Sequence, residues 1–266
     1  MSTLGTALQR TQPLAPGRAL TDSYLLAGRY VRRLLRTPQL VVFQTVQPVM
    51  FMLLFVYVFG GAIHTQLHYV DYLIPGVLVQ ATLFGGGTTT VGLAQDLSEG
   101  MFDRFRSLPM TRPAVLVGRT IADVLKNAVV LALLLAVASA IGFRFHQPVF
   151  TDVAAVALVL VFAYAFSWVY ATIALLVRDP EAAQVAAFVP TFPLVFASSA
   201  FVPTTNMPHW LRLFAEHQPV SITVNAVRAL AETGHAGTLP LTSLAWSAGI
   251  VLVAAPLAIT RYRRLQ

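Results

Sequence analysis

The sequence contains no cysteine and little charge. Disulfide bonds and cysteine metal sites are therefore both excluded. Only 11% of the 266 residues are charged, whereas soluble globular proteins average about 25%. A soluble domain so poor in charge could not easily cover its own surface, and 56% of the residues are hydrophobic. The composition therefore predicts a membrane protein.

The sequence also lacks the pattern G-x-x-x-x-G-K-[ST] that binds nucleotide phosphates, so we expect no ATP site in this chain. The run Gly85-Gly86-Gly87 is no phosphate loop, because no Lys and Ser/Thr complete it; small residues of this kind allow helices to approach closely. The net charge of +7 is explained by arginines that set membrane topology. We therefore expect no nucleic-acid partner, no catalytic residue and no bound cofactor or metal.

Long apolar runs predict an all-α protein with six transmembrane helices. About 20 residues, at ~1.5 Å each, cross a hydrocarbon core ~30 Å thick. The predicted spans are residues 40–60, 72–94, 114–142, 152–177, 182–202 and 239–260. Together they form one transmembrane domain, 40–260, between an N-terminal part, 1–39, and a short tail, 261–266.

The basic residues predict the orientation of these spans. With six spans, fifteen of the 18 Lys and Arg residues fall on one side, and only Arg144, Arg212 and Arg228 fall on the other. Positive residues are retained on the cytoplasmic side of a membrane, so both termini are expected in the cytoplasm. We expect a multi-pass protein of a bacterial-type plasma membrane. In segment 21–36, apolar residues and arginines recur at helical spacing and fall on opposite faces of a helix. This pattern predicts an amphipathic helix that lies on membrane lipids.

Polar residues inside the predicted spans face either other helices or a cavity. Both readings remain open for the candidates for a substrate path, which are Gln44, Gln47, Thr88, Ser198 and Ser199. In the third span, Arg119, Asp123 and Lys126 are spaced to pair on one helix face. We expect pairing and snorkelling toward the interface there, with a buried proton relay as the alternative.

A polar segment, 96–119, interrupts the apolar runs between the second and third spans. Asp96 and Glu99 have the spacing of a capping box at the start of a helix. Leu97, Met101 and Phe105 then continue one apolar stripe, and Pro109 ends it. The segment is predicted to be a short amphipathic helix on the cytoplasmic surface, placed to meet a soluble partner.

The motif E-G-M-F-D-R-F-R-S-L-P-M-T-R, residues 99–112, closely resembles the signature of ABC type-2 transporter permeases, in particular the daunorubicin-resistance exporters. A second stretch is similar to the same family: F-A-S-S-A-F-V-P at 196–203, M-P-H-W-L at 207–211, Q-P at 218–219 and N-A-V-R at 225–228. Many relatives have Ser-Gly where this sequence has Ser198-Ser199-Ala200. The resemblance covers essentially the whole chain in order and spacing.

The resemblance implies that segment 97–108 is a coupling helix docking on a separate cytoplasmic ATPase. The ATPase, present in two copies, would bind ATP and Mg, and a second copy of this permease or a related one would complete the transporter. Short re-entrant extracellular helices would precede the last span. The residues assigned to ATPase coupling are Glu99, Gly100, Phe102, Asp103, Arg104, Phe105, Arg106 and Pro109.

The implied function is ATP-driven export of a hydrophobic drug-like or lipid molecule, such as a multidrug or antibiotic efflux system. The alternative within the family is export of a polysaccharide or glycolipid. A proton-coupled secondary transporter is disfavoured because most acids lie at span ends. A metal-dependent membrane enzyme is conceivable from His64, His68 and Glu216-His217, but no third ligand is fixed by spacing.

Overall fold

The computed structural model describes residues 38–63, 67–99 and 112–264; the regular elements among these residues are all helices, joined by turns, with no strand. The predicted amphipathic helix at 21–36, His64 and residues 100–109 of the predicted coupling helix lie outside the described residues.

Five helices are long and apolar enough to cross a membrane. They coincide with the first, second, third, fourth and sixth predicted spans. The first is α2 (Pro38–Leu54), which continues as a π-helix, η1 (Phe55–Phe59). The others are α3 (Tyr69–Ser98), α5 (Arg112–Ile141), α6 (Val149–Val177) and α10 (Leu239–Arg264).

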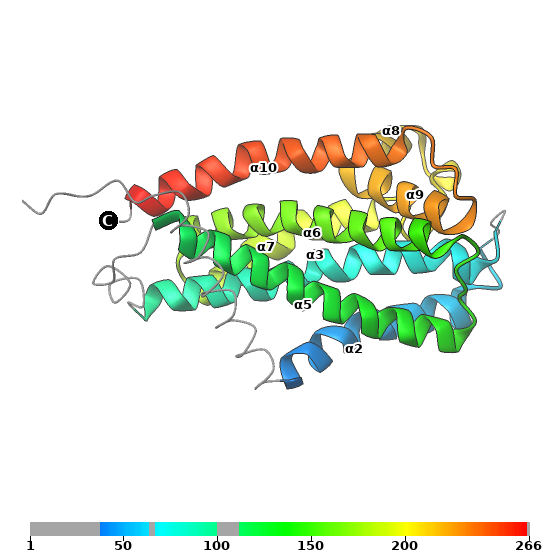
Figure 1. Ribbon diagram of the computed structural model, residues 1–266, viewed down its shortest axis with the longest axis horizontal. Helices are drawn as coiled ribbons and strands as arrows, with labels where there is room; N and C mark the ends of the chain where they lie inside the picture. Colours follow the sequence, from blue (N-terminus) through cyan, green and yellow to red (C-terminus); the bar gives the residue numbers. More distant parts are fainter. Residues whose placement is uncertain (1–37, 64–66, 100–111, 265–266) are drawn as a thin grey trace, which may run out of the picture.

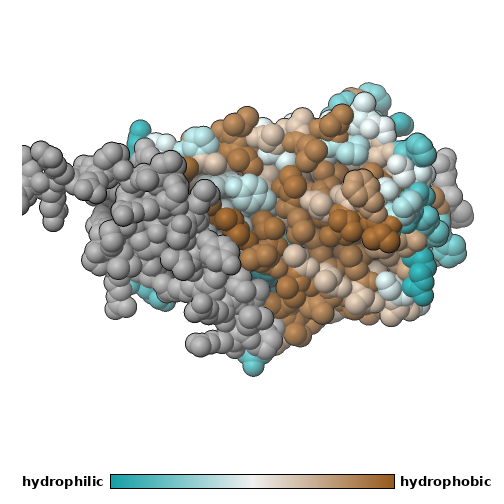
Figure 2. Space-filling model, viewed as in Figure 1, coloured by the Kyte–Doolittle hydropathy of each residue, from teal (hydrophilic) through white to brown (hydrophobic). Residues whose placement is uncertain are grey.

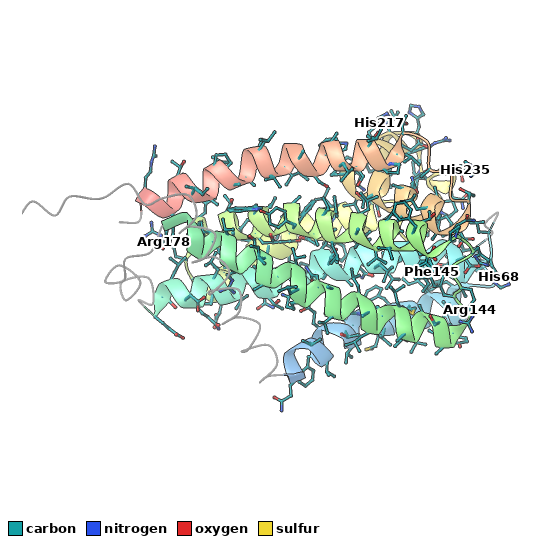
Figure 3. All side chains as sticks on the ribbon, viewed as in Figure 1. His68, Arg144, Phe145, Arg178, His217 and His235 are labelled. Atoms are coloured by element: carbon teal, nitrogen blue, oxygen red, sulfur yellow. The ribbon has the colours of Figure 1, made fainter. Side chains whose placement is uncertain are left out.

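The long helices run side by side along the long axis of the molecule (Figure 1). At one end, on the left of the view, α3 ends and α5 begins; this is the α3–α5 end. At the opposite end lie the short helices α8 (His209–His217) and α9 (Pro219–Glu232); this is the α8–α9 end. Arg178 marks the first end, and Arg144 and His68 mark the second (Figure 3).

An apolar band covers the middle of the molecule on the side seen in Figure 2. Hydrophilic residues gather beyond it at the α8–α9 end. Large apolar side chains are exposed on several helices, including Phe43 on α2, Val185 on α7 and Leu252 on α10. Such an apolar surface is the kind that a lipid bilayer covers.

Helix α3 is the centre of the bundle and contacts α2, α5, α6, α7 and α9. In its membrane-crossing stretch, 72% of the residues are buried. Glycines let its neighbours approach closely: a methyl group at Gly76 would overlap the backbone of Ala200, and one at Gly86 would overlap the ring of Tyr170. The expectation that the glycine run serves helix packing is confirmed at Gly86.

The predicted fifth span, 182–202, is wrong at its C-terminal end. Helix α7 (Pro180–Phe196) is 17 residues long, about 25 Å at the usual helical rise, and residues 197–203 form turns. Asp179 caps the helix by accepting from the backbone N–H of Ala182 at 2.7 Å. Two further prolines, Pro190 and Pro193, each remove a backbone donor near its end.

The two helical pieces predicted between the fifth and sixth spans both exist, as α8 and α9. Helix α8 is amphipathic: Trp210, Leu213 and Phe214 are exposed together, and Ala215 is buried. Helix α9 is largely buried and packs against α6, α10 and α3. Both begin at or directly after a proline, which favours the first helical turn because it needs no backbone donor there.

Candidate functional site: a polar cavity between four helices

A cavity of about 660 Å³ lies between α2, α3, α5 and α7. Its lining comes from the second half of α3, the first half of α5 and the middle of α7, so it occupies the half of the bundle nearer the α3–α5 end. Its aromatic lining residues are Phe84 and Phe188, with 5.8 Å between the ring centroids. The polar lining residues are Gln44, Gln47, Thr88, Thr89, Gln95, Arg119, Asp123, Lys126 and Gln184.

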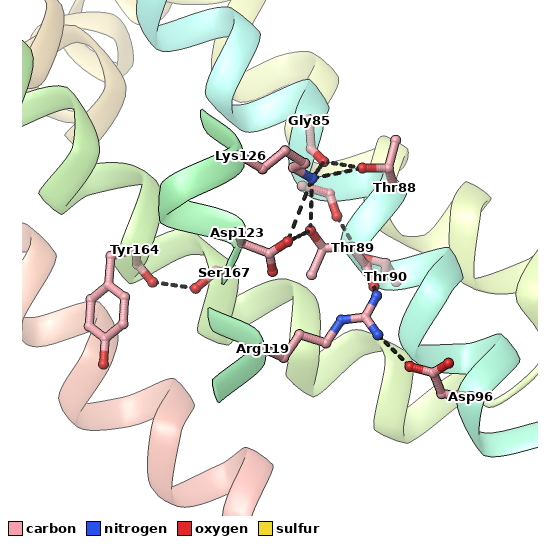
Figure 4. A network of polar contacts seen from close by, with 11 residues as sticks. Gly85, Thr88, Thr89, Thr90, Asp96, Arg119, Asp123, Lys126, Tyr164 and Ser167 are labelled. Atoms are coloured by element: carbon pink, nitrogen blue, oxygen red, sulfur yellow. Dashed lines mark hydrogen bonds and ion pairs between the residues drawn. The ribbon is translucent and has the colours of Figure 1, made fainter. Parts of the chain in front are cut away.

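Lys126 of α5 is held against α3 by a network of polar contacts (Figure 4). Its ammonium donates to Thr88 Oγ1 at 3.0 Å and to Thr89 Oγ1 at 3.4 Å. It also donates to the carbonyl oxygen of Gly85 at 3.3 Å and lies 3.6 Å from Asp123 Oδ1. The Thr89 hydroxyl in turn donates to Asp123 Oδ1 at 2.8 Å. These contacts engage all three donors of the ammonium group.

This network corrects the expectation that Lys126 snorkels toward the interface. Lys126 lies midway along α5, where an ammonium in an apolar environment must find partners inside the protein. The predicted pairing of Asp123 with Lys126 is confirmed. Asp123 is itself buried, at 8% exposure, and its Oδ2 has no hydrogen-bond partner among the described residues.

A second ion pair joins the same two helices closer to the α3–α5 end. Arg119 Nη1 donates to Asp96 Oδ2 at 2.5 Å, and Arg119 Nη2 donates to the Thr89 carbonyl at 3.3 Å. Asp96 therefore does not cap a new helix, as its spacing from Glu99 suggested. It lies inside α3, which runs on to Ser98, because its charge is satisfied by an arginine 23 residues away.

Two glycines of α3 make room for these polar side chains. A methyl group at Gly85 would overlap the Gln44 amide of α2, and one at Gly92 would overlap the Arg119 guanidinium. The hydroxyls of Thr88 and Thr90 donate to the carbonyl oxygens of Gly85 and Gly86, at 2.7 and 3.2 Å. Both threonines therefore satisfy backbone carbonyls within α3.

Three of the five candidates for a substrate path, Gln44, Gln47 and Thr88, meet at this cavity. Ser198 and Ser199 do not line it. They lie in the turns after α7, where the Ser199 hydroxyl donates to Asn225 Oδ1 at 2.9 Å. Lys126, Gln95 and Gln184 were not among the candidates. The sequence spacing of these three residues does not show which helices pack together, so it could not place them at one cavity.

The turns at 197–203 are clamped between α3 and α9 by Arg228. Its guanidinium donates twice to the Tyr72 carbonyl, at 3.0 and 2.9 Å, and once to the Ser199 carbonyl at 3.0 Å. It donates to Asn225 Oδ1 at 2.8 Å and lies 3.6 Å from the centroid of the Tyr72 ring. The Tyr72 hydroxyl also donates to the Ser199 carbonyl at 3.0 Å.

Aromatic rings pack beside this clamp, on the side of the cavity away from the α3–α5 end. Phe201 stacks on Phe55 at 4.7 Å and on Phe196 at 5.4 Å, measured between centroids. Phe51 lies within 6.2 Å of both Phe55 and Phe201. The π-helical turn of η1 begins at Phe55, directly at this cluster.

Of the residues assigned to ATPase coupling, the structure describes only Glu99. It follows the last residue of α3, and its backbone N–H donates to the carbonyls of Gln95 and Leu97. Among the described residues no three His, Asp or Glu side chains could hold one metal ion together, and the candidate His64 lies outside them. His68 and His217 both lie at the α8–α9 end (Figure 3).

Comparison with known proteins identifies the family. The family model described as ABC-2 type transporter matches residues 22–231, most of the chain. This chain belongs to the ABC-2 type transporter family. It is a membrane permease subunit of an ABC transporter, and the recognised motifs at 99–112 and 196–211 fall inside the matched region.

Similar permeases carry drug-resistance names. The chain is 35% identical to the daunorubicin resistance ABC transporter permease protein DrrB1 of Streptomyces coeruleorubidus, over 81% of this chain and 77% of that one. It is 27% identical to the probable doxorubicin resistance ABC transporter permease protein DrrC of Mycobacterium tuberculosis, over 92% of this chain and 89% of that one. The similarity therefore extends over most of both relatives.

Proposed function

We propose that this permease exports a drug-like amphipathic molecule from the cytoplasm or the inner leaflet, and that the cavity between α2, α3, α5 and α7 holds the cargo before export. The observation that carries the proposal is the position of the cavity. It lies in the half of the bundle nearer the α3–α5 end, between the two helices that flank the segment assigned to ATPase coupling, and the Arg228 clamp and the phenylalanine cluster lie beyond it. We therefore expect the cargo to enter the cavity from the side on which the ATPase docks.

The orientation follows from charge. Arg178, Arg261 and Arg264 lie at the α3–α5 end, and Arg144, Arg212 and Arg228 at the α8–α9 end. With the arginine-rich segments 1–39 and 99–112 on the first side, the positive-inside rule makes the α3–α5 end cytoplasmic. Helix α7, with the turns at 197–203, then serves as the fifth of six spans, and α8 and α9 are the re-entrant helices on the outer side.

Because the sequence lacks a phosphate-binding loop, the ATP site belongs to a separate subunit. ATP and Mg bind two copies of a separate cytoplasmic ATPase, and a second copy of this permease or a related one completes the transporter. Glu99, Asp103, Arg104 and Arg106 make polar contacts with the ATPase, with Gly100 and Pro109 shaping the segment, and Phe102 or Phe105 fills a groove. ATP drives transport because it binds the two conformations with different affinities.

The cavity volume favours one small molecule over a polymer. Pockets of about 300–1,000 Å³ suit drug-sized ligands. The names of the relatives, daunorubicin and doxorubicin resistance permeases, support a drug-like cargo. Efflux of this kind would confer antibiotic resistance. Lipid and glycolipid cargoes remain outcomes of the test.

The test is reconstitution of the permease with its ATPase in vesicles, with daunorubicin as the probe. Glu99→Ala and Arg106→Ala are expected to lower ATP-dependent uptake at least tenfold while the permease keeps its thermal stability. Glu181→Ala, which removes an exposed acid after the α6–α7 turn at the same end, is the matched control and should transport normally. Unchanged transport and assembly in the first two variants would exclude the docking role. Transport of lipid but not daunorubicin would exclude the drug-like cargo.

A further inference from the structure

A groove of about 760 Å³ lies between α6 and α10, separate from the polar cavity. Its walls are almost wholly apolar and include Ile173 of α6 and Trp246 and Leu257 of α10. At Gly249, which also lines it, an added methyl group would find nothing within 4 Å, so the groove is open there. The α10 lining extends over residues 242–257, about 22 Å at the usual helical rise. Half of a bilayer's hydrocarbon core is ~15 Å thick, so the groove is long enough for one acyl chain.

The two hydroxyl groups in the groove are already used within the protein. Thr172 Oγ1 donates to the carbonyl oxygens of Trp168 and Ala254, at 2.8 and 3.2 Å, and the second bond joins α6 to α10. Thr242 Oγ1 donates to the carbonyl oxygen of Thr238 at 3.0 Å. A hydroxyl has one hydrogen, so neither group has a donor left for a ligand. A ligand in this groove is therefore held by apolar contact, as a hydrocarbon chain is.

Cationic side chains follow the groove at the α3–α5 end. Arg261 and Arg264 lie four and seven residues beyond Leu257, a spacing that places all three on one face of α10. Arg261 is therefore one helical turn, about 6 Å, past the groove. Arg178 directly follows α6 at the same end of the molecule (Figure 3). The three arginines are exposed, and none forms an ion pair with another residue in the described part of the chain.

A second copy of the permease fits this groove less well than a lipid. Ala245 and Gly249 are four residues apart, a spacing of small residues that lets transmembrane helices pair. Two copies in one membrane have the same orientation, so a two-fold contact through this face would bring Arg261 and Arg264 towards their own counterparts. Like charges at such a contact repel. An anionic phosphate, in contrast, accepts charge-assisted hydrogen bonds from both arginines.

We propose that an anionic phospholipid of the cytoplasmic leaflet binds here, with one acyl chain in the groove and its phosphate at Arg261 and Arg264. Basic residues at the cytoplasmic ends of transmembrane helices attract the anionic lipids of that leaflet. Arg178 contributes less, because Asp179 and Glu181 follow it directly. The site rests on the orientation proposed above and is independent of the cargo, since the lipid is a lasting component of the permease.

Fluorescence quenching by brominated lipids tests the proposal on the full-length permease in phosphatidylcholine vesicles. Trp246 lines the groove and is 43% exposed, so it is the reporter, and the signal lost in Trp246→Phe is assigned to it. We expect brominated phosphatidylglycerol to compete for the groove with an affinity at least about fivefold higher than that of brominated phosphatidylcholine. Trp210 of α8, isolated in the same way with Trp210→Phe, lies outside the groove and should not distinguish the two lipids.

Charge variants identify the headgroup contact. The double variant Arg261→Gln/Arg264→Gln should abolish the preference for phosphatidylglycerol, and the fold should tolerate it because both side chains are exposed. Arg212→Gln, which removes an exposed arginine of α8 at the opposite end, is the matched control and should keep the preference. Thermal unfolding gives a second readout, since a bound lipid stabilises the folded state. Phosphatidylglycerol should raise the melting temperature of the wild type and of Arg212→Gln, but not of the double variant.

A groove-filling variant tests the position of the acyl chain. Gly249→Leu places a side chain in the open part of the groove and should remove most of the rise in melting temperature that phosphatidylglycerol gives. Ala248→Leu, at an exposed position of α10 outside the groove, is the matched control and should keep that rise. The charge variants remain informative even where Gly249→Leu fails to fold.

Three results would contradict the proposal. Equal quenching of Trp246 by the two lipids would show that the groove does not select a headgroup. A preference unchanged in Arg261→Gln/Arg264→Gln would place the phosphate elsewhere. Weakened self-association of Gly249→Leu, with an unchanged lipid preference, would assign the groove to a second copy of the permease. Failure of the daunorubicin export assay with the lipid preference intact would instead count against the proposed function alone.

Discussion

Arg119 of α5 donates to Asp96 of α3 with 2.5 Å between Nη1 and Oδ2, and the two side chains are only 13% and 7% exposed. The pair joins the two helices that enter and leave the segment assigned to ATPase coupling. It lies beside the cavity, and Arg119 lines it. A displacement of that segment would therefore move the cavity lining, because the ion pair joins the two helices that flank the segment.

Removal of one member of this pair should destabilise the permease. Asp96→Ala leaves the Arg119 guanidinium buried beside a lost partner, and breaking a buried pair in this way costs about 3–5 kcal/mol. Thermal unfolding in detergent measures the loss. The double variant Asp96→Ala/Arg119→Met leaves no buried cation behind and should recover part of the stability. A double variant less stable than Asp96→Ala would contradict this account.

Neighbouring glycines of α3 should respond oppositely to alanine. Gly86→Ala places a methyl group on the Tyr170 ring and should cost about 1–3 kcal/mol of unfolding free energy through overpacking. At Gly87 nothing lies within 4 Å of the added methyl group, so Gly87→Ala should be neutral or stabilising by up to about 1 kcal/mol. The two variants are compared by chemical denaturation in the same detergent. Equal effects at the two positions would show that the ring contact with Gly86 does not limit packing.

The Arg228 clamp should require the shape of arginine as well as its charge. Lysine retains the charge but cannot reach the Tyr72 and Ser199 carbonyls and Asn225 with one planar group. Arg228→Lys should therefore lower thermal stability and expose residues 197–203 to faster hydrogen exchange. Arg212→Lys is the control, because Arg212 makes an exposed pair with Glu216, and such surface pairs contribute little to stability. Equal exchange in wild type and Arg228→Lys would rule out the clamp.

Glu232 at the end of α9 should give stability a distinct pH dependence. Burial raises the pKa of its carboxyl above the ordinary 4.5, and the charge of Asp71 raises it further, while His146 opposes the shift. The folded state therefore holds this proton more tightly than the unfolded state. The contribution of Glu232 to stability is complete below pH 4.5 and is lost as pH rises through the folded-state pKa.

The variant Glu232→Gln should remove that decline in melting temperature above pH 4.5. The opposite sign is expected at Glu216, whose pKa is lowered by its hydrogen bond from Arg212. Its contribution is present above the ordinary pKa and is lost as pH falls, so Glu216→Gln should flatten the acid side instead. Melting curves recorded from pH 4 to 8 compare the two variants. A decline that persists in Glu232→Gln would assign it to another group.

Much of this protein was determined by its sequence. Apolar runs long enough to cross a bilayer are a local property, so hydropathy located five membrane-length helices without any knowledge of packing. The motifs at 99–112 and 196–211 identified the family for the same reason, since they are contiguous. Helix ends proved less predictable: α7 stops at Phe196 because Pro190, Pro193 and the clamp on Ser199 favour turns there.

The tertiary structure alone decided which polar residues face one another. From the sequence, Asp96 was a helix cap and Lys126 a snorkelling cation. In the fold each finds its partners on another helix, Arg119 for the first and Thr88 and Thr89 for the second. Such choices depend on the rotation and spacing of helices distant in sequence, which no single-helix pattern encodes. The same packing places Gln44 and Gln184 at one cavity. The turns after α7 instead place Ser199 beside Arg228.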